Sequence, residues 1–336
     1  MPPTWLVCRD PSVTGAATIG VDIGGSKILA GVVDSNGRVL ARARVATPHL
    51  STTPLVVEDT IVDAVRRLRS ENDLEVAAAG IGAAGFVDAA GALVRFSPHL
   101  SWRDEPVRDA LAGRLDLPVV LDNDANAAAA AEMAYGAGRG HRQVLCLTLG
   151  TGIGGALVID GRVFRGANGM AGEFGHMQVV PGGRACECGN RGCWEQYSSG
   201  NALVRAAREL LKERSAYAHV LHELAAGDPA NVTGPLVTRA AAEGDRATLA
   251  IFQEVGGWLG TGLAGFVAAF DPELVIVGGG VSDAGDLLLD PAREALRRTL
   301  TGRGFRPEPP LVTASLGADA GFIGAAVVAR EVVHER

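Results

Sequence analysis

The chain has 336 residues, of which 47% are hydrophobic and 21% are charged, and its formal net charge is −7. This length is sufficient for two lobes that each have a hydrophobic core. The acidic balance and the lack of a basic stripe argue against a nucleic-acid partner. No apolar run is long enough for a signal peptide or a membrane span. We therefore expect a cytosolic protein without a membrane partner.

A pattern of strand, glycine turn, strand and hairpin occurs twice along the chain. Residues 18–33 predict two strands around Gly24-Gly25, and Asn36-Gly37 is typical of a hairpin turn. Residues 143–164 repeat the pattern, with a shorter hairpin turn at Asp160-Gly161. Since apolar alternation and turn chemistry agree at both copies, we interpret the pattern as a duplication that produces two related α/β lobes facing each other across a cleft. The alternative is coincidence, because glycine hairpins are common.

The rest of the chain alternates helices and strands, which is typical of an α/β fold. We expect helices at 60–70, 124–135, 202–211, 236–242, 246–270 and 318–335, and further strands at 76–81, 117–121, 144–149, 274–277 and 311–316. The helix over 246–270 contains five glycines, which destabilise a helix unless another element packs closely against them. The expected domains are an N-terminal extension (1–17), a small α/β domain (18–122) to which the C-terminal helix (318–336) returns, and a large α/β domain (123–317) with an inserted zinc loop (176–193).

The two glycine turns are candidates for binding nucleotide phosphates. A tight turn between strands can direct several backbone N–H groups at one point and so form an anion-binding nest. One such turn would be explained by an ordinary hairpin. Two turns at matching positions, Gly24-Gly25 and Gly150-Thr151-Gly152, favour a nucleotide site, and a third glycine patch at Gly278-Gly279 supports it. Neither turn matches the P-loop or the dinucleotide fingerprint.

Four polar residues gather where the strand over 117–121 ends and the alanine-rich helix begins: Asp122, Asn123, Asp124 and Asn126. Helix capping explains one of them. Their number at the carboxyl end of a strand, where α/β proteins bind ligands, indicates a functional site. Phosphoryl transfer to a hydroxyl needs an acceptor for its proton, so we predict Asp124 as the general base. We expect the helix N-terminus to keep Asp124 ionised and a neighbouring amide to hold the sugar.

Three cysteines and a histidine have the spacing of a metal site. His176, Cys186, Cys188 and Cys193 would complete a tetrahedral, structural zinc site, and four protein ligands leave no open position for catalysis. Free or redox-active thiols are the alternative. Glu173 and Glu195 flank the cluster and could accept sugar hydroxyls, although they could also be solvated surface charges. A zinc-bound imidazole keeps a second N–H that could orient a hydroxyl.

Together these motifs resemble the ROK family of sugar kinases (repressors, open reading frames, kinases) over about residues 18–329. The resemblance implies the two-lobed, duplicated ribonuclease H-like fold of hexokinase and actin, with ATP and magnesium as cofactors beside the zinc. It implies Asp124 as the base. It also implies that Ser26 and Lys27 bind the nucleotide together with Gly24-Gly25. The residues that it implies as sugar contacts are Gly85, Asn123, Asp124, Glu173, His176 and Glu195. Ser26 and Asp122 depart from the more usual threonine and glutamate but keep the hydroxyl and the charge.

The segments at 193–200 and 270–282 are similar to glucokinases of actinobacterial type, so we predict ATP-dependent conversion of glucose to glucose 6-phosphate. The same residues could serve a kinase for N-acetylmannosamine, fructose or another hexose, with specificity set by the loops at 85–88 and 97–102. A sugar-sensing regulator is disfavoured by the acidic balance and by the retained Asp124, and polyphosphate as donor by the lack of a basic groove. We expect a homo-oligomer, either a dimer or a tetramer.

Overall fold

The computed structural model describes residues 6–7, 17–72 and 75–334. By its internal contacts the chain forms two compact units. Unit 1 comprises the described residues of Met1–Arg142, Ala156–Gly172 and Ser315–Arg336, and unit 2 comprises Gln143–Gly155 and Glu173–Ala314. Most of the predicted N-terminal extension lies outside the described residues. The described helices include none that is both long enough and apolar enough to cross a membrane.

Unit 1 is built on a six-stranded sheet with the order β1-β4-β3-β2-β5-β9. The strands are β1 (Leu6–Val7), β2 (Ala17–Ile23), β3 (Lys27–Val33), β4 (Val39–Ala46), β5 (Val76–Ala83) and β9 (Val119–Asn123). Neighbours from β1 to β2 are antiparallel, whereas β2, β5 and β9 are parallel. The carboxyl ends of β2, β5 and β9 therefore meet at one edge, which is where α/β proteins place ligands.

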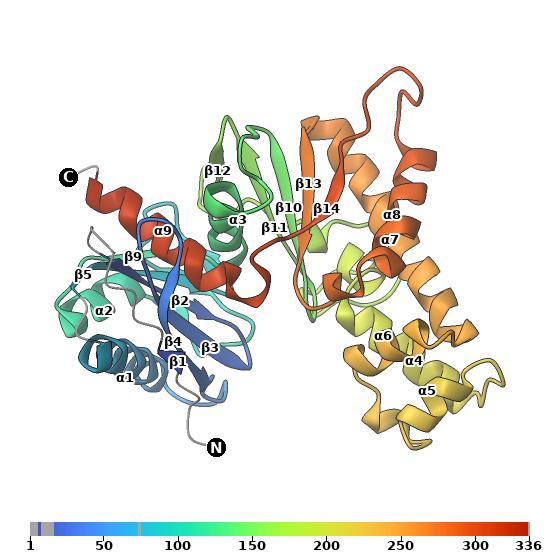
Figure 1. Cartoon of the computed structure of the whole chain (residues 1–336), viewed down its shortest axis with the longest axis horizontal. Coiled ribbons are helices and arrows are strands. Elements are labelled where there is room, and N and C mark those ends of the chain that lie inside the picture. The colour runs from blue at the N-terminus through green and yellow to red at the C-terminus, as the bar shows by residue number, and fades with distance from the viewer. Residues whose placement is uncertain (1–5, 8–16, 73–74, 335–336) are drawn as a thin grey trace. The chain divides into compact units, whose positions relative to one another are not determined.

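Helices cover both faces of this sheet (Figure 1). They are α1 (Pro54–Asn72), α2 (Val107–Leu115), α3 (Asp124–Tyr135) and α9 (Ala320–His334). The side chains of Ile61, Val65 and Leu68 on α1 belong to the same buried cluster as Ile19 and Val21 on β2. On the opposite face, α9 packs against β2 and β5 and lies beside α3. The predicted helix at 124–135 is confirmed residue for residue.

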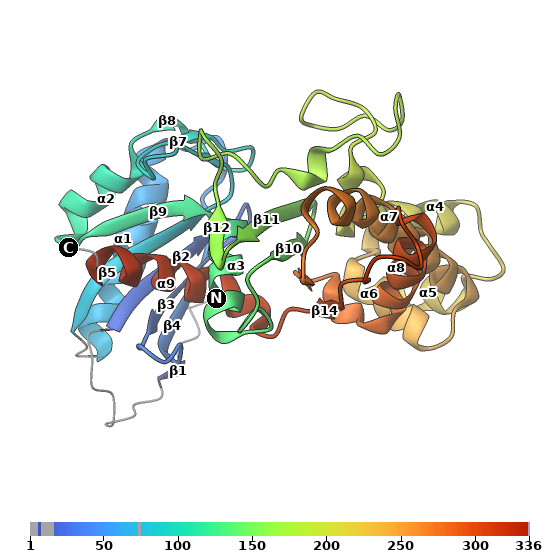
Figure 2. The ribbon, with the colours of Figure 1, turned by 90° about the horizontal axis from the view of Figure 1, so that it is seen from above.

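A short sheet, which the sequence did not predict, lies beside β9 (Figure 2). It is formed by β6 (Phe86–Val87), β7 (Val94–Phe96) and β8 (Arg103–Glu105). Strands of two or three residues leave too little alternation to detect in a sequence. The loop at 97–102 connects β7 to β8, so this sheet supports one of the two loops expected to control specificity.

Both predicted hairpin turns are confirmed. Gly37, between β3 and β4, has a φ of 82°. Asp160 and Gly161 join β11 (Ile153–Ile159) to β12 (Arg162–Phe164) with φ values of 53° and 77°. Positive φ at both central residues defines a type I′ turn, whose twist matches that of the paired strands.

Unit 2 contains the parallel strands β10 (Val144–Leu149), β13 (Leu274–Gly278) and β14 (Leu311–Thr313). Its helices are α4 (Gly200–Lys212), α5 (His219–Leu224), α6 (Gly234–Ala242), α7 (Arg246–Phe270) and α8 (Asp286–Thr299). Helix α7 has the predicted bounds, whereas α5 and α8 were not predicted. A proline inside α8, Pro291, obscured its helical pattern.

The glycines of α7 explain how this helix packs. An added Cβ at Gly256 or Gly260 would collide with the backbone of α8, and one at Gly262 would overlap the Trp194 indole. The expectation of close packing is therefore confirmed for three of the five glycines. Gly257 and Gly265 meet no other atom within 4 Å, so their side of the helix is open.

The contacts divide the chain differently from the predicted domain boundary between residues 122 and 123. Helix α3 and residues 156–172 belong to unit 1, because α3 packs along α9 and against β5. The division into domains at 18–122 and 123–317 stays a prediction.

Candidate active site

The predicted catalytic turn, residues 122–126, joins β9 to α3 in unit 1. Asn123 is the N-cap of α3, and its Oδ1 accepts hydrogen bonds from the backbone N–H groups of Ala125 (2.9 Å) and Asn126 (3.1 Å). Its Nδ2 donates to the carbonyl of Gly85 at 3.1 Å. Asn123 thus satisfies free N–H groups of the helix and links the turn to Gly85. A side-chain hydrogen bond from Asn123 also acts on the Asp124 carboxyl and lowers its pKa.

Asp124 is the first residue of α3, and its Oδ1 accepts a hydrogen bond from Ala125 N at 2.9 Å. Burial raises the pKa of this carboxyl, and the backbone hydrogen bonds and the charge of His99 lower it by less. We expected the helix N-terminus to keep Asp124 ionised; the backbone hydrogen bonds act in that direction, and desolvation of the carboxylate opposes them with the larger effect on the pKa. A raised pKa makes Asp124 a stronger proton acceptor.

Two residues that we did not assign to the site from the sequence also belong to this region. Asp22, near the end of β2, has its pKa raised to about 7 by burial and by the charge of Asp124, while Lys27 acts in the opposite direction. His99 lies against Gly25, where an added Cβ would come within 2.8 Å of the His99 Cβ. Asp22 lies two residues before the predicted Gly24-Gly25 turn and could have been found from that proximity. No pattern in the sequence indicated that His99 would lie at this site.

The first glycine turn joins β2 to β3. The N–H of Gly24 donates to the Lys27 carbonyl at 3.1 Å, and Thr47 Oγ1 donates to the Gly24 carbonyl at 2.6 Å. Neither glycine of this turn has a positive φ. Glycine is needed at residue 25 because His99 leaves no space for a side chain.

The matching turn of unit 2 follows β10. Gly150 N donates to the Gly152 carbonyl at 3.0 Å, and the first residues of α4 donate backbone hydrogen bonds to the carbonyls of Gly150 (2.8 Å) and Thr151 (3.3 Å). An added Cβ at Gly152 would overlap the Glu195 carboxylate. Close by, Gly279 has a φ of 84°, and its Cβ position lies 2.5 Å from the Leu149 carbonyl oxygen. The predicted nucleotide residues Gly150, Thr151, Gly152, Gly278 and Gly279 thus gather at the ends of β10 and β13.

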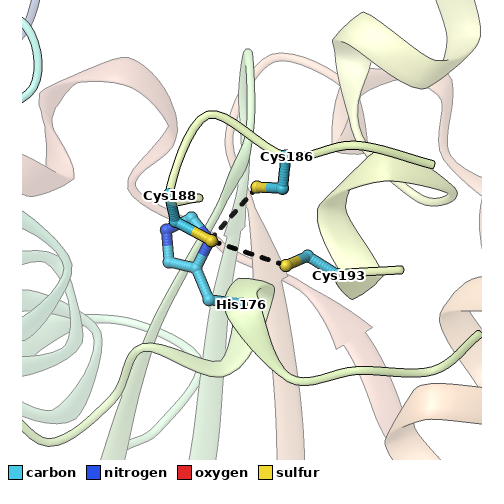
Figure 3. Close-up of side chains that lie close together, drawn as sticks. All are labelled: His176, Cys186, Cys188 and Cys193. Carbon is cyan, nitrogen blue, oxygen red and sulfur yellow. Dashed lines mark hydrogen bonds between the residues drawn. The ribbon is translucent and has the colours of Figure 1, made fainter. Parts of the chain in front are cut away.

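The four predicted metal ligands converge in unit 2 (Figure 3). One ligand atom from each of His176, Cys186, Cys188 and Cys193 lies within 4.8 Å of all the others. The His176 Nδ1 to Cys186 Sγ distance is 3.7 Å, and the Cys188 and Cys193 sulfurs are 3.6 Å apart. Zn–S bonds of about 2.3 Å and Zn–N bonds of about 2.0 Å in a tetrahedron require ligand separations of this size. The geometry therefore suits a tetrahedral metal ion.

His176 lies between the two predicted sugar-binding carboxylates. Its Nδ1, on the side of the cysteines, is 3.5 Å from Glu195 Oε1, and its Nε2 is 3.8 Å from Glu173 Oε2. Glu195 also accepts hydrogen bonds from the Cys186 thiol (3.1 Å) and from Ile153 N (3.4 Å). One imidazole can thus bind a metal through Nδ1 and direct Nε2 toward a ligand beside Glu173.

Two thiols of this cluster, those of Cys186 and Cys193, have raised pKa values, whereas the pKa of the Cys188 thiol is lowered. Burial, together with the neighbouring Glu195 carboxylate and the other two cysteines, raises the pKa of the Cys186 thiol to about 12. A divalent cation reverses this effect because it stabilises the thiolates directly. The donor set is therefore consistent with metal binding.

The chain belongs to the ROK family, whose sequence model it matches over residues 18–332. It is 47% identical to a glucokinase of Streptomyces coelicolor over 94% of this chain and 98% of that protein. It is 38% identical to a glucokinase of Thermotoga maritima over 93% of this chain and 97% of that protein. The structure of a ROK glucokinase from Streptomyces griseus in complex with glucose and AMPPNP superposes with a TM-score of 0.87, at 48% identity, covering 94% of this chain and all of that one. The predicted family and the two-lobed hexokinase/actin-type α/β fold are confirmed.

The structure distributes the predicted site residues over both units. Unit 1 contains Gly24, Gly25, Ser26, Lys27, Gly85, Asn123 and Asp124, and unit 2 contains Gly150, Thr151, Gly152, Glu173, His176, Cys186, Cys188, Cys193, Glu195, Gly278 and Gly279. Their individual roles stay predictions.

Proposed function

We propose that this protein is an ATP-dependent hexose kinase that converts glucose to glucose 6-phosphate. The observation that supports this most is the catalytic turn, where a carboxylate with a raised pKa begins a helix beside a capping amide. The similarity to glucokinases over nearly the whole chain supports glucose as the acceptor and ATP as the donor.

In the proposed reaction Asp124 accepts the proton of the sugar hydroxyl while the hydroxyl oxygen attacks the γ-phosphorus of ATP. The new O–P bond forms as the bond from the γ-phosphorus to the β,γ-bridging oxygen breaks, and ADP is the leaving group. The raised pKa of Asp124 matches this task, since a weak acid is a good proton acceptor. Asn123 would hold the sugar through its amide group, next to the Asp124 carboxyl. Asp22 would hold the magnesium ion, which neutralises charge on the phosphates. A cation would also relieve the repulsion between the Asp22 and Asp124 carboxylates.

We assign a structural zinc ion to His176, Cys186, Cys188 and Cys193. Such an ion would order the loop at 176–193 and fix the imidazole so that Nε2 faces the sugar beside Glu173. Because all four positions of a tetrahedral site are filled by protein, the ion would supply structure and not chemistry. A cytosolic location and a homo-oligomeric state stay predictions.

A coupled assay with Mg-ATP and a panel of sugars tests the proposal. We expect the highest kcat/KM with glucose among glucose, mannose, fructose, N-acetylmannosamine and N-acetylglucosamine. A clear preference for another sugar would overturn the assignment of glucose but not the kinase. Sugar binding without turnover of any member of the panel would instead favour a non-catalytic sugar sensor.

A further inference from the structure

We propose that Arg165 is a positioning residue for the general base, acting through Asp122. This inference rests on the proposed function of Asp124. Arg165 follows β12 and is distant in sequence from the catalytic turn, yet both lie in unit 1. Its guanidinium group forms an ion pair with the carboxylate that precedes Asn123 and Asp124.

The Asp122 carboxylate is fully occupied by hydrogen bonds. Its side chain is only 6% exposed. Oδ1 accepts from Asn123 N (2.8 Å) and from Asn126 Nδ2 (3.1 Å). Oδ2 accepts from Arg165 Nε (3.0 Å) and Nη2 (2.5 Å). Within the described part of the chain, Oδ1 therefore accepts hydrogen bonds only from the catalytic turn, and Oδ2 accepts them only from Arg165.

The two Oδ1 bonds lie on either side of the base. Asn123 immediately precedes Asp124, and Asn126 follows it by two residues in the first turn of α3. A carboxylate that contacts both limits the ways in which the turn can rotate. Asp122 thus couples the orientation of Asp124 to its own position in β9.

Arg165 is the charged partner that holds the Asp122 carboxylate in place. A buried carboxylate needs a partner charge, since an unpaired one becomes protonated or moves toward water. Arg165 directs two N–H donors of one planar group, Nε and Nη2, at the single oxygen Oδ2, a geometry that lysine cannot reproduce. Without them, the contacts of Asp122 with Asn123 and Asn126 weaken.

Arg165 is itself held by its own loop. Its Nη1 donates to the Val163 carbonyl at 3.3 Å, and its carbonyl accepts from Ala171 N at 3.1 Å. The segment at 165–172 is thus a closed loop that presents the guanidinium group to Asp122. In sequence this loop leads directly to Glu173, the first of the predicted sugar carboxylates.

The first experiment compares kinetics of Arg165→Met, Arg165→Lys and the control Arg162→Met, which removes an exposed arginine from the same hairpin. We expect kcat of Arg165→Met to fall by about 10–100-fold, because small misplacements of reacting groups have effects of this size. The KM for ATP should stay within about twofold of wild type. The kcat of Arg165→Lys should lie between those of Arg165→Met and the wild type, and the kcat of Arg162→Met should equal that of the wild type. A further variant, Arg165→Ala, tests chemical rescue: added guanidinium ion should restore part of its kcat.

The second experiment measures backbone hydrogen exchange in the segment at 121–127, and it does not depend on kinase activity. We expect faster exchange in Arg165→Met and no change in Arg162→Met, with similar melting temperatures. Wild-type exchange in Arg165→Met would overturn the inference, as would wild-type kcat. If the wild-type protein turns over no hexose, the proposed function fails, and the exchange comparison still decides whether Arg165 orders this turn.

Discussion

The catalytic turn and the metal loop (residues 176–193) are organised in different ways. The turn at 122–126 joins a strand to a helix, and its polar groups pair with each other and with free N–H groups of the helix. The metal loop contains no regular element longer than three residues and only isolated bridges between its segments. Its donor atoms converge, but burial and the neighbouring Glu195 carboxylate raise the pKa of the Cys186 thiol. Secondary structure therefore preorganises the first region, whereas the second lacks such support and is the region for which we propose a bound ion.

Asp124→Asn should have the largest effect of any single change to the catalytic turn. We expect kcat to fall by about 10²–10⁴-fold, which is the usual contribution of a general base. Glucose affinity, measured by calorimetry, should change little because the amide has the same shape. The matched control is Glu187→Gln, which neutralises an exposed acid on the metal loop. Normal turnover by Asp124→Asn would remove this residue from the mechanism.

Cys188→Ser, or chelation of the metal, should disrupt the metal loop and leave the catalytic turn intact. We expect loss of bound zinc, a lower melting temperature and a KM for glucose raised by about 10–100-fold, as for lost metal-site contacts. Hydrogen exchange at 121–127 should not change. Cys146→Ala, which removes a buried thiol outside the cluster, should keep the metal. Metal-free protein with normal kinetics and stability would show that the loop needs no ion.

Two glycine-to-alanine changes in α7 test how the metal loop is anchored. Gly262 contacts Trp194, which lies between Cys193 and Glu195 and donates from Nε1 to the Trp258 carbonyl at 2.8 Å. Gly262→Ala should destabilise the protein by about 1–3 kcal/mol, because the indole must move. Gly265→Ala has open space and should stabilise it by about 0.5–1 kcal/mol. Urea unfolding measures the change in the free energy of unfolding for both variants. Changes of the same sign would contradict the close contact of Gly262 with Trp194 and the open space at Gly265.

His99→Gln should have the smallest effect, visible in the pH dependence of kcat. The charge of His99 lowers the pKa of Asp124, so its removal raises that pKa further. Because the base must be ionised, activity lost on acidification should then be lost at a higher pH. The control His219→Gln changes an exposed histidine of unit 2. If the pH at which kcat falls on acidification stays the same in His99→Gln, or becomes lower, the charge of His99 does not control the pKa of Asp124.

Much of the site was predictable because its signals are local in the chain. The metal ligands lie within 18 residues of one another, and the capping residues of α3 are consecutive. The roles of His99 and Arg165 were not predictable, because each depends on a contact with a segment distant in sequence. The effect of burial on the pKa of Asp124 was not predictable either, since the helix N-terminus is visible in a sequence and burial is not.

The sequence by itself determined the family, the positions of α3 and α7, both hairpin turns and the residues of the metal cluster. These follow from helix propensity, turn chemistry and ligand spacing, which act over a few residues. Only the tertiary structure decided that α9 packs beside α3, that Trp194 occupies the space above Gly262, and that Arg165 pairs with Asp122. The physical reason is that burial, close packing and ion pairing depend on which distant segments meet, and alternation of apolar residues does not specify that.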